Sequence, residues 1–215
     1  MKKIGIMGGT FNPIHYGHLL LAENAYYQFE LDKVYIMPTN HPQYRTISSG
    51  ISNEERCQMI SMAIEDNPHL ALSYEELNRE GATYTAETLS ILTTKNIETR
   101  YYFIMGADSL FHIETWKDPA TIFSLCHIIV APRMSQVTSE LESQIDYLMA
   151  KYQDASIDIL NTPNLDISSH GIRKRVRQNQ SIRYLLPSNV EEYIISNHLY
   201  CLGDEKNAGK NFKNL

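Results

Sequence analysis

The sequence predicts an α/β fold, a Rossmann-like doubly wound parallel sheet with a small helical part near its C-terminal end. Short continuous apolar runs alternate along the chain with amphipathic helical patterns, which is typical of buried parallel strands joined by crossover helices. The length of 215 residues fits one domain with a substantial core. We expect that domain over residues 1–200, with a helical subdomain at about 168–200 and a flexible tail over 203–215.

Six apolar runs predict the strands of the sheet, and six amphipathic segments predict helices around it. The strands are expected at Lys3–Met7, Val34–Met37, Leu70–Tyr74, Tyr101–Met105, His127–Ala131 and Ile157–Leu160. The helices are expected at about His18–Phe29, Ser52–Glu65, Thr85–Lys95, Glu140–Tyr152, Ser169–Gln178 and Asn189–Ser196. The S-x-x-E pattern of Ser52 and Glu55 predicts a capping box, and Thr85 is a candidate cap of its own helix.

Composition excludes several classes of protein. The formal net charge of -6 argues against nucleic acid as the main partner, although a cleft can be locally positive on an acidic protein. No run approaches the ~20 apolar residues that span a bilayer, and the N-terminal apolar run breaks at Gly8 before it forms a signal-peptide core. Three scattered cysteines, Cys57, Cys126 and Cys201, indicate reduced thiols. Together these features predict a cytoplasmic protein with no membrane partner, and they leave a homo-oligomer open.

The segment Gly8–His18, GGTFNPIHYGH, follows the first predicted strand and is the strongest candidate for a binding loop. It matches neither of the two commonest phosphate loops, G-x-G-x-x-G and G-x-x-x-x-G-K-[ST]. Gly8 and Gly9 allow a ligand to approach the backbone, and Gly17 is expected to let the chain turn into the next helix. In a parallel sheet, a turn after a strand lies at the edge where ligands bind.

His15 and His18 stand three residues apart, so both imidazoles can face one phosphate chain if the helix begins between them. A histidine donates a hydrogen bond to phosphate in either protonation state. Two other interpretations are open. The pair could bind a transition metal, but no third ligand stands nearby, or the residues could be ordinary surface histidines.

The segment Gly8–His18 resembles the N-terminal motif of the HxGH nucleotidyltransferase superfamily. A second motif of that superfamily, ISSxxIR, is matched by Ile167–Arg173, near the other end of the chain and in the expected order. The resemblance implies that the second serine, Ser169, and Arg173 hold the ATP phosphates at a helix N-terminus. Ser169 is then expected as the N-cap or first residue of that helix, with Arg173 on the same face. His170 stands where many members have Thr.

Three further segments resemble the bacterial nicotinate mononucleotide adenylyltransferases. They are Tyr84–Leu89, in which Glu87 replaces the usual Asp, Phe103–Leu110, and Thr115–Lys117. The resemblance implies that Trp116 stacks on the pyridine ring, and that Gly106 and Asp108 form a turn near the ATP ribose. Trp116 could also be a packing residue. Arg45 is a candidate cation for binding the phosphates, although it lies in the segment that departs most from the family pattern.

The resemblance therefore implies a complete set of site residues. The catalytic residues are expected to be His15, His18 and Arg173. The ATP-binding residues are expected to be Gly8, Gly9, Thr10, Phe11, His15, His18, Gly106, Asp108, Ile167, Ser168, Ser169 and Arg173. The residues that bind the second substrate are expected to be Asn12, Arg45, Tyr84, Thr85, Trp116 and Lys117.

The implied reaction joins ATP and nicotinate mononucleotide to give nicotinate adenine dinucleotide and pyrophosphate, a step of NAD biosynthesis. Mg²⁺ is expected to be held mainly by phosphate oxygens and water, with no metal site built from protein side chains. Two alternatives remain: nicotinamide mononucleotide as the preferred acceptor, or a nucleotide-binding regulatory protein without turnover. The hypothesis requires His15, His18 and Arg173 to line one cavity.

Overall fold

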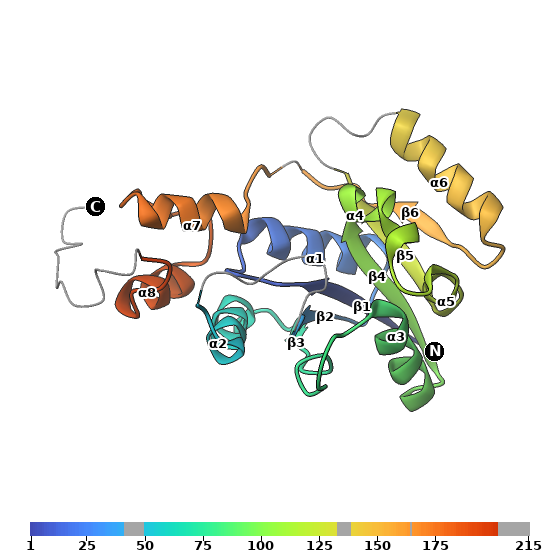
Figure 1. The fold of residues 1–215 in the computed structure, drawn as a ribbon, viewed down its shortest axis with the longest axis horizontal. Helices are drawn as coiled ribbons and strands as arrows, with labels where there is room; N and C mark the ends of the chain where they lie inside the picture. The colour runs from blue at the N-terminus through green and yellow to red at the C-terminus, as the bar shows by residue number, and fades with distance from the viewer. Residues whose placement is uncertain (41–49, 133–138, 164, 202–215) are drawn as a thin grey trace.

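The computed structural model describes residues 1–40, 50–132, 139–163 and 165–201. Its centre is a parallel sheet of six strands in the order β3-β2-β1-β4-β5-β6 (Figure 1). The strands are β1 Lys2–Gly9, β2 Lys33–Pro38, β3 Leu70–Leu72, β4 Thr99–Gly106, β5 Cys126–Ala131 and β6 Ile157–Ile159. All six predicted strands are present. From β1 the next two strands are added on one side of the sheet, and β4 to β6 are added on the other side. The position between β1 and β4 is therefore the switch point of a doubly wound sheet.

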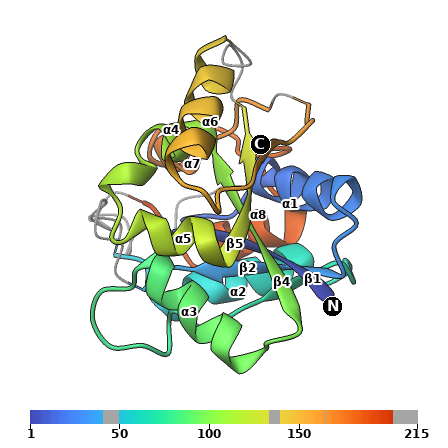
Figure 2. The same cartoon turned by 90° about the vertical axis from the view of Figure 1, so that its right-hand side faces the viewer.

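Helices cover both faces of this sheet, as the alternating pattern predicts (Figures 1 and 2). They are α1 Tyr16–Gln28, α2 Asn53–Ile64, α3 Thr85–Lys95, α4 Ala107–Phe111, the 3₁₀ helix η1 Ile113–Thr115, α5 Pro119–Leu125, α6 Ser139–Lys151, α7 Ser169–Arg177 and α8 Ser188–Ser196. One core cluster joins the sheet to α1, α2, α7 and α8, and the other joins it to α3, α4, α5 and α6. The fold is the predicted Rossmann-like α/β class.

Three helical segments, α4, η1 and α5, were not predicted. The helices α4 and η1 have five and three residues, too few for an amphipathic period to show. The start of α5 does have a sequence signal, an Asp followed by Pro. Asp118 is the N-cap, and its carboxylate accepts a hydrogen bond from the Thr121 N–H at 3.3 Å. Pro119 is the first helical residue. The expected turn at Gly106 and Asp108 is therefore the first turn of α4, with Gly106 as its N-cap.

The helix after the binding loop begins earlier than predicted. Its first residue is Tyr16 and its N-cap is His15, two residues before the start expected at about His18, so the helix does begin between the two histidines. The usual start signals are missing here: His15 stands at the N-cap, and His18, the third helical residue, accepts from the His15 backbone N–H, a contact that Glu or Gln usually makes in a capping box. At α2 the predicted capping box is present, with Ser52 N–H donating to Glu55 at 2.7 Å and Glu55 N–H donating to Ser52 at 3.1 Å.

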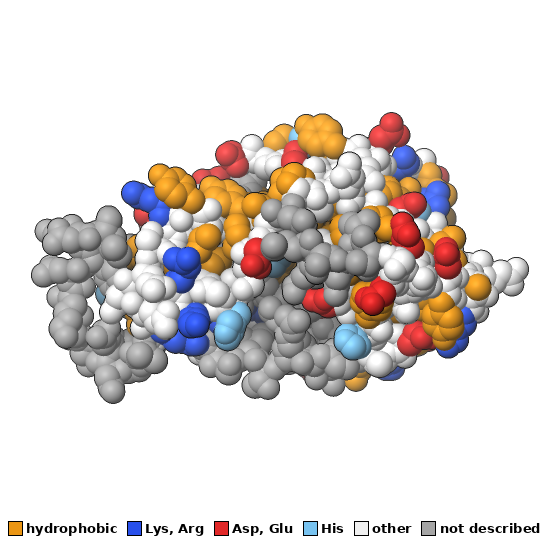
Figure 3. All heavy atoms as spheres, turned by 90° about the horizontal axis from the view of Figure 1, so that it is seen from above, with side chains coloured by type: hydrophobic (Ala, Val, Ile, Leu, Met, Phe, Trp, Pro, Cys, Tyr) orange, Lys and Arg blue, Asp and Glu red, His pale blue; other side chains and the backbone are white. Residues whose placement is uncertain are grey.

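The C-terminal helices α7 and α8 lie beyond one end of the sheet, where α8 packs against α2 (Figure 1). Three basic residues of α7, Lys174, Arg175 and Arg177, are exposed, as expected of a solvated helix face. Figure 3 shows Lys and Arg side chains near this end of the molecule and acidic side chains over the middle of the same face. Among the described residues, no helix combines the length and apolar character that crossing a membrane requires.

Candidate active site

A cavity of about 1200 Å³ opens at the carboxyl ends of the strands. Its lining includes the ends of four neighbouring strands, at Gly9 of β1, Met37 of β2, Gly106 of β4 and Ala131 of β5. The loop before α1, the start of α3, α4 and the start of α7 complete the wall. This is the position that the sheet topology predicts for a ligand.

The two histidines of the N-terminal motif lie against each other and both line this cavity. Their rings are stacked, with centroids 3.7 Å apart and an angle of 25° between the planes. His18 Nδ1 accepts a hydrogen bond from the backbone N–H of His15 at 3.3 Å. Because an accepting ring nitrogen is unprotonated, the neutral His18 ring carries its proton on Nε2 and can donate it to a ligand.

The surroundings of His18 favour this neutral form. Burial lowers its pKa well below the ordinary value of 6.5, and the neighbouring His15 lowers it further. Burial penalises the charged ring, and a second imidazole 3.7 Å away makes it harder to charge both. His18 is therefore a hydrogen-bond donor with little positive charge of its own at neutral pH.

Gly17 makes room for this pair, although it does not form the tight turn that the sequence led us to expect. It lies inside α1, and a Cβ there would come within 3.0 Å of two atoms of the His15 ring and 3.6 Å of the Ile167 carbonyl oxygen. A side chain at this position would require the His15 ring to shift, whereas the Ile167 carbonyl oxygen lies at an ordinary contact distance. Gly17 is thus required by close packing, and its backbone is ordinary helix.

The two motifs meet through hydrogen bonds between α7 and the loop before α1. Ser169 Oγ donates to the Pro13 carbonyl at 2.8 Å, and Arg173 Nη1 donates to the Asn12 carbonyl at 2.6 Å. Ser168 is the N-cap of α7 and accepts from the Gly171 N–H at 3.1 Å. The partners Ser169–Pro13 and Arg173–Asn12 are 156 and 161 residues apart in sequence.

Arg173 keeps capacity for a ligand after this contact. Partial burial lowers the pKa of Arg173 below its ordinary value, Tyr200 acts in the opposite direction, and Arg177 lowers the pKa further. A guanidinium carries five N–H donors, and the Asn12 carbonyl takes one of them. Since Arg173 also lines the cavity, further donors can reach a phosphate there.

Two buried residues that sequence reasoning missed support the same loop from behind. Arg56 of α2 has no exposed surface and donates to the carbonyls of Thr10 and Thr39, both at 2.7 Å, and to Asn53 Oδ1 at 2.6 Å. The Tyr200 hydroxyl, also buried, donates to Asn12 Oδ1 at 2.7 Å. No local pattern marks either residue, because both act on backbone or side chains distant in sequence.

The cavity is also lined by aromatic and polar side chains. Trp116 lines it, with its ring edge-to-face to Phe103 at a centroid distance of 6.2 Å. Lys117 Nζ lies 4.3 Å from the centroid of the Tyr84 ring and donates to Glu87 at 2.6 Å. The charge of Lys117 is therefore already paired with a carboxylate.

Thr85 is not the cap of α3. It is the first helical residue, Tyr84 is the N-cap, and that cap has no side-chain hydrogen bond. The cap expected at Thr85 was wrong because Thr85 already belongs to the helix, one position after the N-cap.

The structure brings most of the predicted site residues to this one cavity. Those that line it are Gly8, Gly9, Thr10, Asn12, His15, His18, Tyr84, Thr85, Gly106, Asp108, Trp116, Lys117, Ile167, Ser168, Ser169 and Arg173. The side chain of Phe11 does not line it: it is buried in the core and meets the His18 ring edge-on, with centroids 5.0 Å apart. Arg45 lies outside the described residues.

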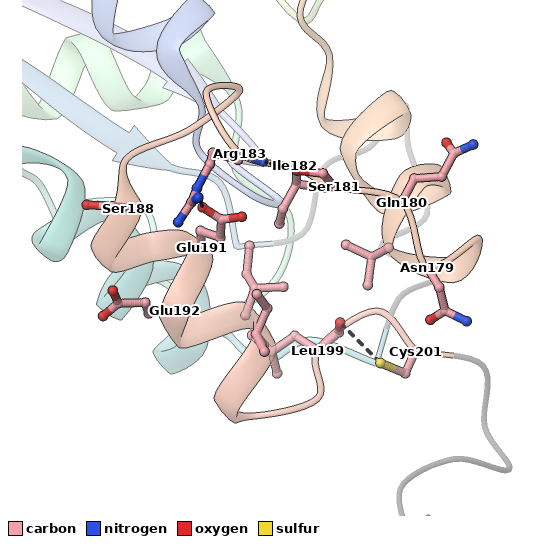
Figure 4. Close-up of a pocket in the computed structure, with 13 residues that line it drawn as sticks. Asn179, Gln180, Ser181, Ile182, Arg183, Ser188, Glu191, Glu192, Leu199 and Cys201 are labelled. Carbon is pink, nitrogen blue, oxygen red and sulfur yellow. Dashed lines mark hydrogen bonds and ion pairs between the residues drawn. The ribbon is translucent and has the colours of Figure 1, made fainter. Parts of the chain in front are cut away.

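A second cavity, of about 180 Å³, lies between the end of α7 and α8 (Figure 4). Its lining includes Cys201 and the ion pair of Arg183 with Glu191, at 3.9 Å. None of the predicted site residues lines it. None of the three cysteines forms a disulfide, as the sequence indicates.

Comparisons with known proteins identify the family of the chain. A family model described as cytidylyltransferase-like matches residues 6–175. A probable nicotinate-nucleotide adenylyltransferase of Lachnoclostridium phytofermentans is 46% identical over 200 residues, which cover 93% of this chain and 100% of the relative. A relative of the same description from Moorella thermoacetica is 42% identical over 199 residues, covering 92% of this chain and 91% of its own.

Solved structures share the fold. The Plasmodium falciparum nicotinic acid mononucleotide adenylyltransferase complexed with NaAD superposes with a TM-score of 0.76 at 19% identity, covering 93% of this chain and 98% of its own. The same enzyme complexed with APC gives a TM-score of 0.75 at 20% identity, with the same coverage. At this level of identity the likeness concerns the fold, and the sequence relatives decide the family. The chain belongs to the nicotinate-nucleotide adenylyltransferase family of cytidylyltransferase-like proteins.

Proposed function

We propose that the chain transfers the adenylyl group of ATP to the 5'-phosphate of nicotinate mononucleotide, giving nicotinate adenine dinucleotide and pyrophosphate. The observation that carries the proposal is one cavity whose lining combines the phosphate donors His15, His18 and Arg173 with the Trp116 ring. A molecule with phosphates between two aromatic bases fits such a cavity. The family of the chain supports the same reaction.

The bond that forms joins a phosphate oxygen of the mononucleotide to the α-phosphorus of ATP, and the bond that breaks releases pyrophosphate. A phosphate monoester has a second pKa near ~6, so the attacking oxygen is already anionic at neutral pH and needs no general base. The physical obstacle is repulsion between anions and the growing charge on the leaving group. Positioning and electrostatic stabilisation are therefore the main tasks of the site.

We assign these tasks to three side chains. The His18 Nε2–H and the Arg173 guanidinium are placed to donate to phosphate oxygens, and His15 stacks on His18 and holds its ring. The contacts of Ser169 and Arg173 with the Pro13 and Asn12 carbonyls hold the loop and α7 in one rigid arrangement. Donors that are already in place cost no reorganisation when the charge develops.

Nucleotidyltransferases of this kind generally use a divalent metal with ATP, and we propose Mg²⁺. In the parts of the chain that the structure describes, no three His, Cys, Asp or Glu side chains come together as a metal site. The donor set that remains is the phosphate oxygens with water, which Mg²⁺ prefers. When bound, the ion supplies positive charge to the triphosphate.

The start of α3 supports nicotinate over nicotinamide as the acceptor. Tyr84 caps this helix without a side-chain hydrogen bond, and Tyr84 and Thr85 line the cavity. The N–H groups of a first turn, together with the helix dipole, favour a carboxylate over a neutral amide. The acceptor ring would stack on Trp116, and stacking of this kind is worth ~1–3 kcal/mol per base in nucleic-acid complexes.

The test is a pyrophosphate-release assay with ATP, Mg²⁺ and three acceptors side by side: nicotinate mononucleotide, nicotinamide mononucleotide and phosphopantetheine. We expect nicotinate mononucleotide to give the highest kcat/KM. A higher kcat/KM with nicotinamide mononucleotide would make that compound the preferred acceptor. ATP binding without pyrophosphate release in the presence of any acceptor would favour a regulatory role. In a second arm, EDTA should abolish turnover reversibly and leave the Tm of the nucleotide-free chain unchanged, because the metal is expected to arrive with ATP.

A further inference from the structure

A buried carboxylate that the proposed mechanism does not use lies in the wall of the cavity. Glu76 is 7% exposed, yet it lines the end of the cavity that also contains Tyr84 and Thr85. A buried carboxylate is costly unless hydrogen bonds compensate it. Both oxygens of Glu76 are compensated, since Oε1 accepts from the Thr88 hydroxyl at 3.0 Å and Oε2 accepts from the Thr83 hydroxyl at 3.1 Å.

Both partners of Glu76 border the two residues that we assign to the acceptor. Thr83 immediately precedes Tyr84, and Thr88 lies in the first turn of α3, where its hydroxyl also lies 3.1 Å from the Tyr84 carbonyl oxygen. Burial raises the pKa of the Glu76 carboxyl, while the hydrogen bonds from Thr88 and Thr83 and the charge of Arg79 lower it. The Glu76 carboxylate thus stabilises the segment 83–88 through its two hydrogen bonds.

The same support reaches the Trp116 side of the cavity through a chain of polar contacts. Arg79 Nη1 donates to the Thr88 hydroxyl at 2.8 Å, and its Nη2 donates to Glu87 Oε2 at 2.9 Å. The other Glu87 oxygen accepts from Lys117, the neighbour of Trp116 in sequence, at 2.6 Å. These polar contacts involve two carboxylates, Glu76 and Glu87, and two cations, Arg79 and Lys117, so together they add no net charge to this part of the cavity.

We propose that Glu76 is a positioning residue for the acceptor substrate: its carboxylate holds Thr83 and Thr88 and so fixes Tyr84 and Thr85, which line the same cavity as the Trp116 ring. This inference rests on the proposed function, because it places the pyridine mononucleotide at this end of the cavity. ATP is assigned to the other end, with His15, His18 and Arg173, so the loss of Glu76 should weaken acceptor binding and leave ATP binding nearly unchanged.

The single tryptophan gives a direct measure of acceptor binding. Nicotinate mononucleotide is titrated without ATP while Trp116 fluorescence is recorded, and the KM for ATP is measured separately by pyrophosphate release. For Glu76→Ala we expect the Kd for nicotinate mononucleotide to rise at least 10-fold and the KM for ATP to change less than about twofold. Glu76→Gln keeps one accepting oxygen and should restore the Kd to within about threefold of wild type.

The neighbouring carboxylate offers a matched control. Glu75 comes from the same segment, pairs with Lys95 and does not line the cavity, so Glu75→Ala should leave both constants unchanged. If Glu76→Ala fails to fold, Thr83→Val and Thr88→Val decide the question, because each removes one hydrogen bond to Glu76 and should raise the Kd roughly 3- to 10-fold.

Two failures can be told apart. Wild-type protein that neither binds nor turns over nicotinate mononucleotide would overturn the proposed function. Wild-type protein that does both, with a Kd unaffected by the Glu76 and threonine substitutions, would overturn only the role of Glu76. An equal rise in the acceptor Kd and the ATP KM would assign Glu76 to general stability and also reject the positioning role.

Discussion

At the scale of single residues, the site depends on where protons lie. His18 accepts from the His15 backbone through Nδ1, which directs its Nε2–H outward, and its pKa is lowered by burial and by His15. A neutral donor of this kind stabilises a phosphate by a directed hydrogen bond, while Arg173 supplies the permanent charge. The two side chains therefore have different tasks, although both line the same cavity.

Removing this donor should be costly for catalysis. We expect His18→Ala to lower kcat at least ~100-fold, which is comparable to losing a transition-state donor in other enzymes. Steady-state assays at saturating ATP and acceptor measure it. The matched control is His69→Gln, since His69 pairs with Glu23 at 2.8 Å and does not line the cavity. A change below about threefold for His18→Ala would remove His18 from the mechanism.

At the scale of elements, one loop is held from two sides. In front, α7 donates to the carbonyls of Asn12 and Pro13. Behind, Arg56 of α2 donates to the Thr10 carbonyl and joins it to the Thr39 carbonyl at the end of β2. Burial lowers the pKa of Arg56, but three acceptors surround the charged group. A loop held in this way can present His15 and His18 in a fixed arrangement.

The support behind the loop should be visible in stability. Arg56→Met leaves buried carbonyl groups without a partner, and each costs about 1–3 kcal/mol, so we expect unfolding free energy to fall by about 2–5 kcal/mol. Urea denaturation followed by circular dichroism measures the change. Arg177→Met, at an exposed position of α7, is the control and should stay within about 0.5 kcal/mol of wild type. A similar small loss for Arg56→Met would contradict the role given to Arg56.

At the scale of the whole molecule, two histidines link stability to pH. Burial lowers the pKa of both His18 and His127, so both are neutral in the folded chain at pH values where the unfolded chain takes up protons. Their contribution to stability is present above the ordinary value of 6.5 and is lost as pH falls through the lowered folded pKa. Glu76, whose pKa is raised, acts in the opposite direction and loses its contribution as pH rises.

We therefore expect the Tm to fall as the pH is lowered from 7.5 to 5.5, and to fall less in His18→Asn than in wild type. For a chain of this size each kcal/mol corresponds to roughly 2–4 °C, which calorimetry resolves. Equal slopes for wild type and His18→Asn would show that His18 titrates alike in the folded and unfolded chain.

The sequence by itself determined where the strands and most of the helices lie along the chain, the class of the sheet and both motifs. Those features are local: apolar runs mark buried strands, Ser52 and Glu55 close a capping box, and the motif residues are contiguous. The start of α1 was not predicted at the right residue because His15 replaces the usual capping residue. The helix α4 was not predicted because five residues are too few to show a helical hydrophobic period.

Only the tertiary structure decided which residues support the site. Tyr200 reaches Asn12 across 188 residues, and Arg56 reaches Thr10 across 46. Glu76 joins Thr83 and Thr88 of the α3 region in the cavity wall. Such contacts follow from chain topology and from the cost of leaving buried polar groups unpaired, and neither can be read from a local pattern.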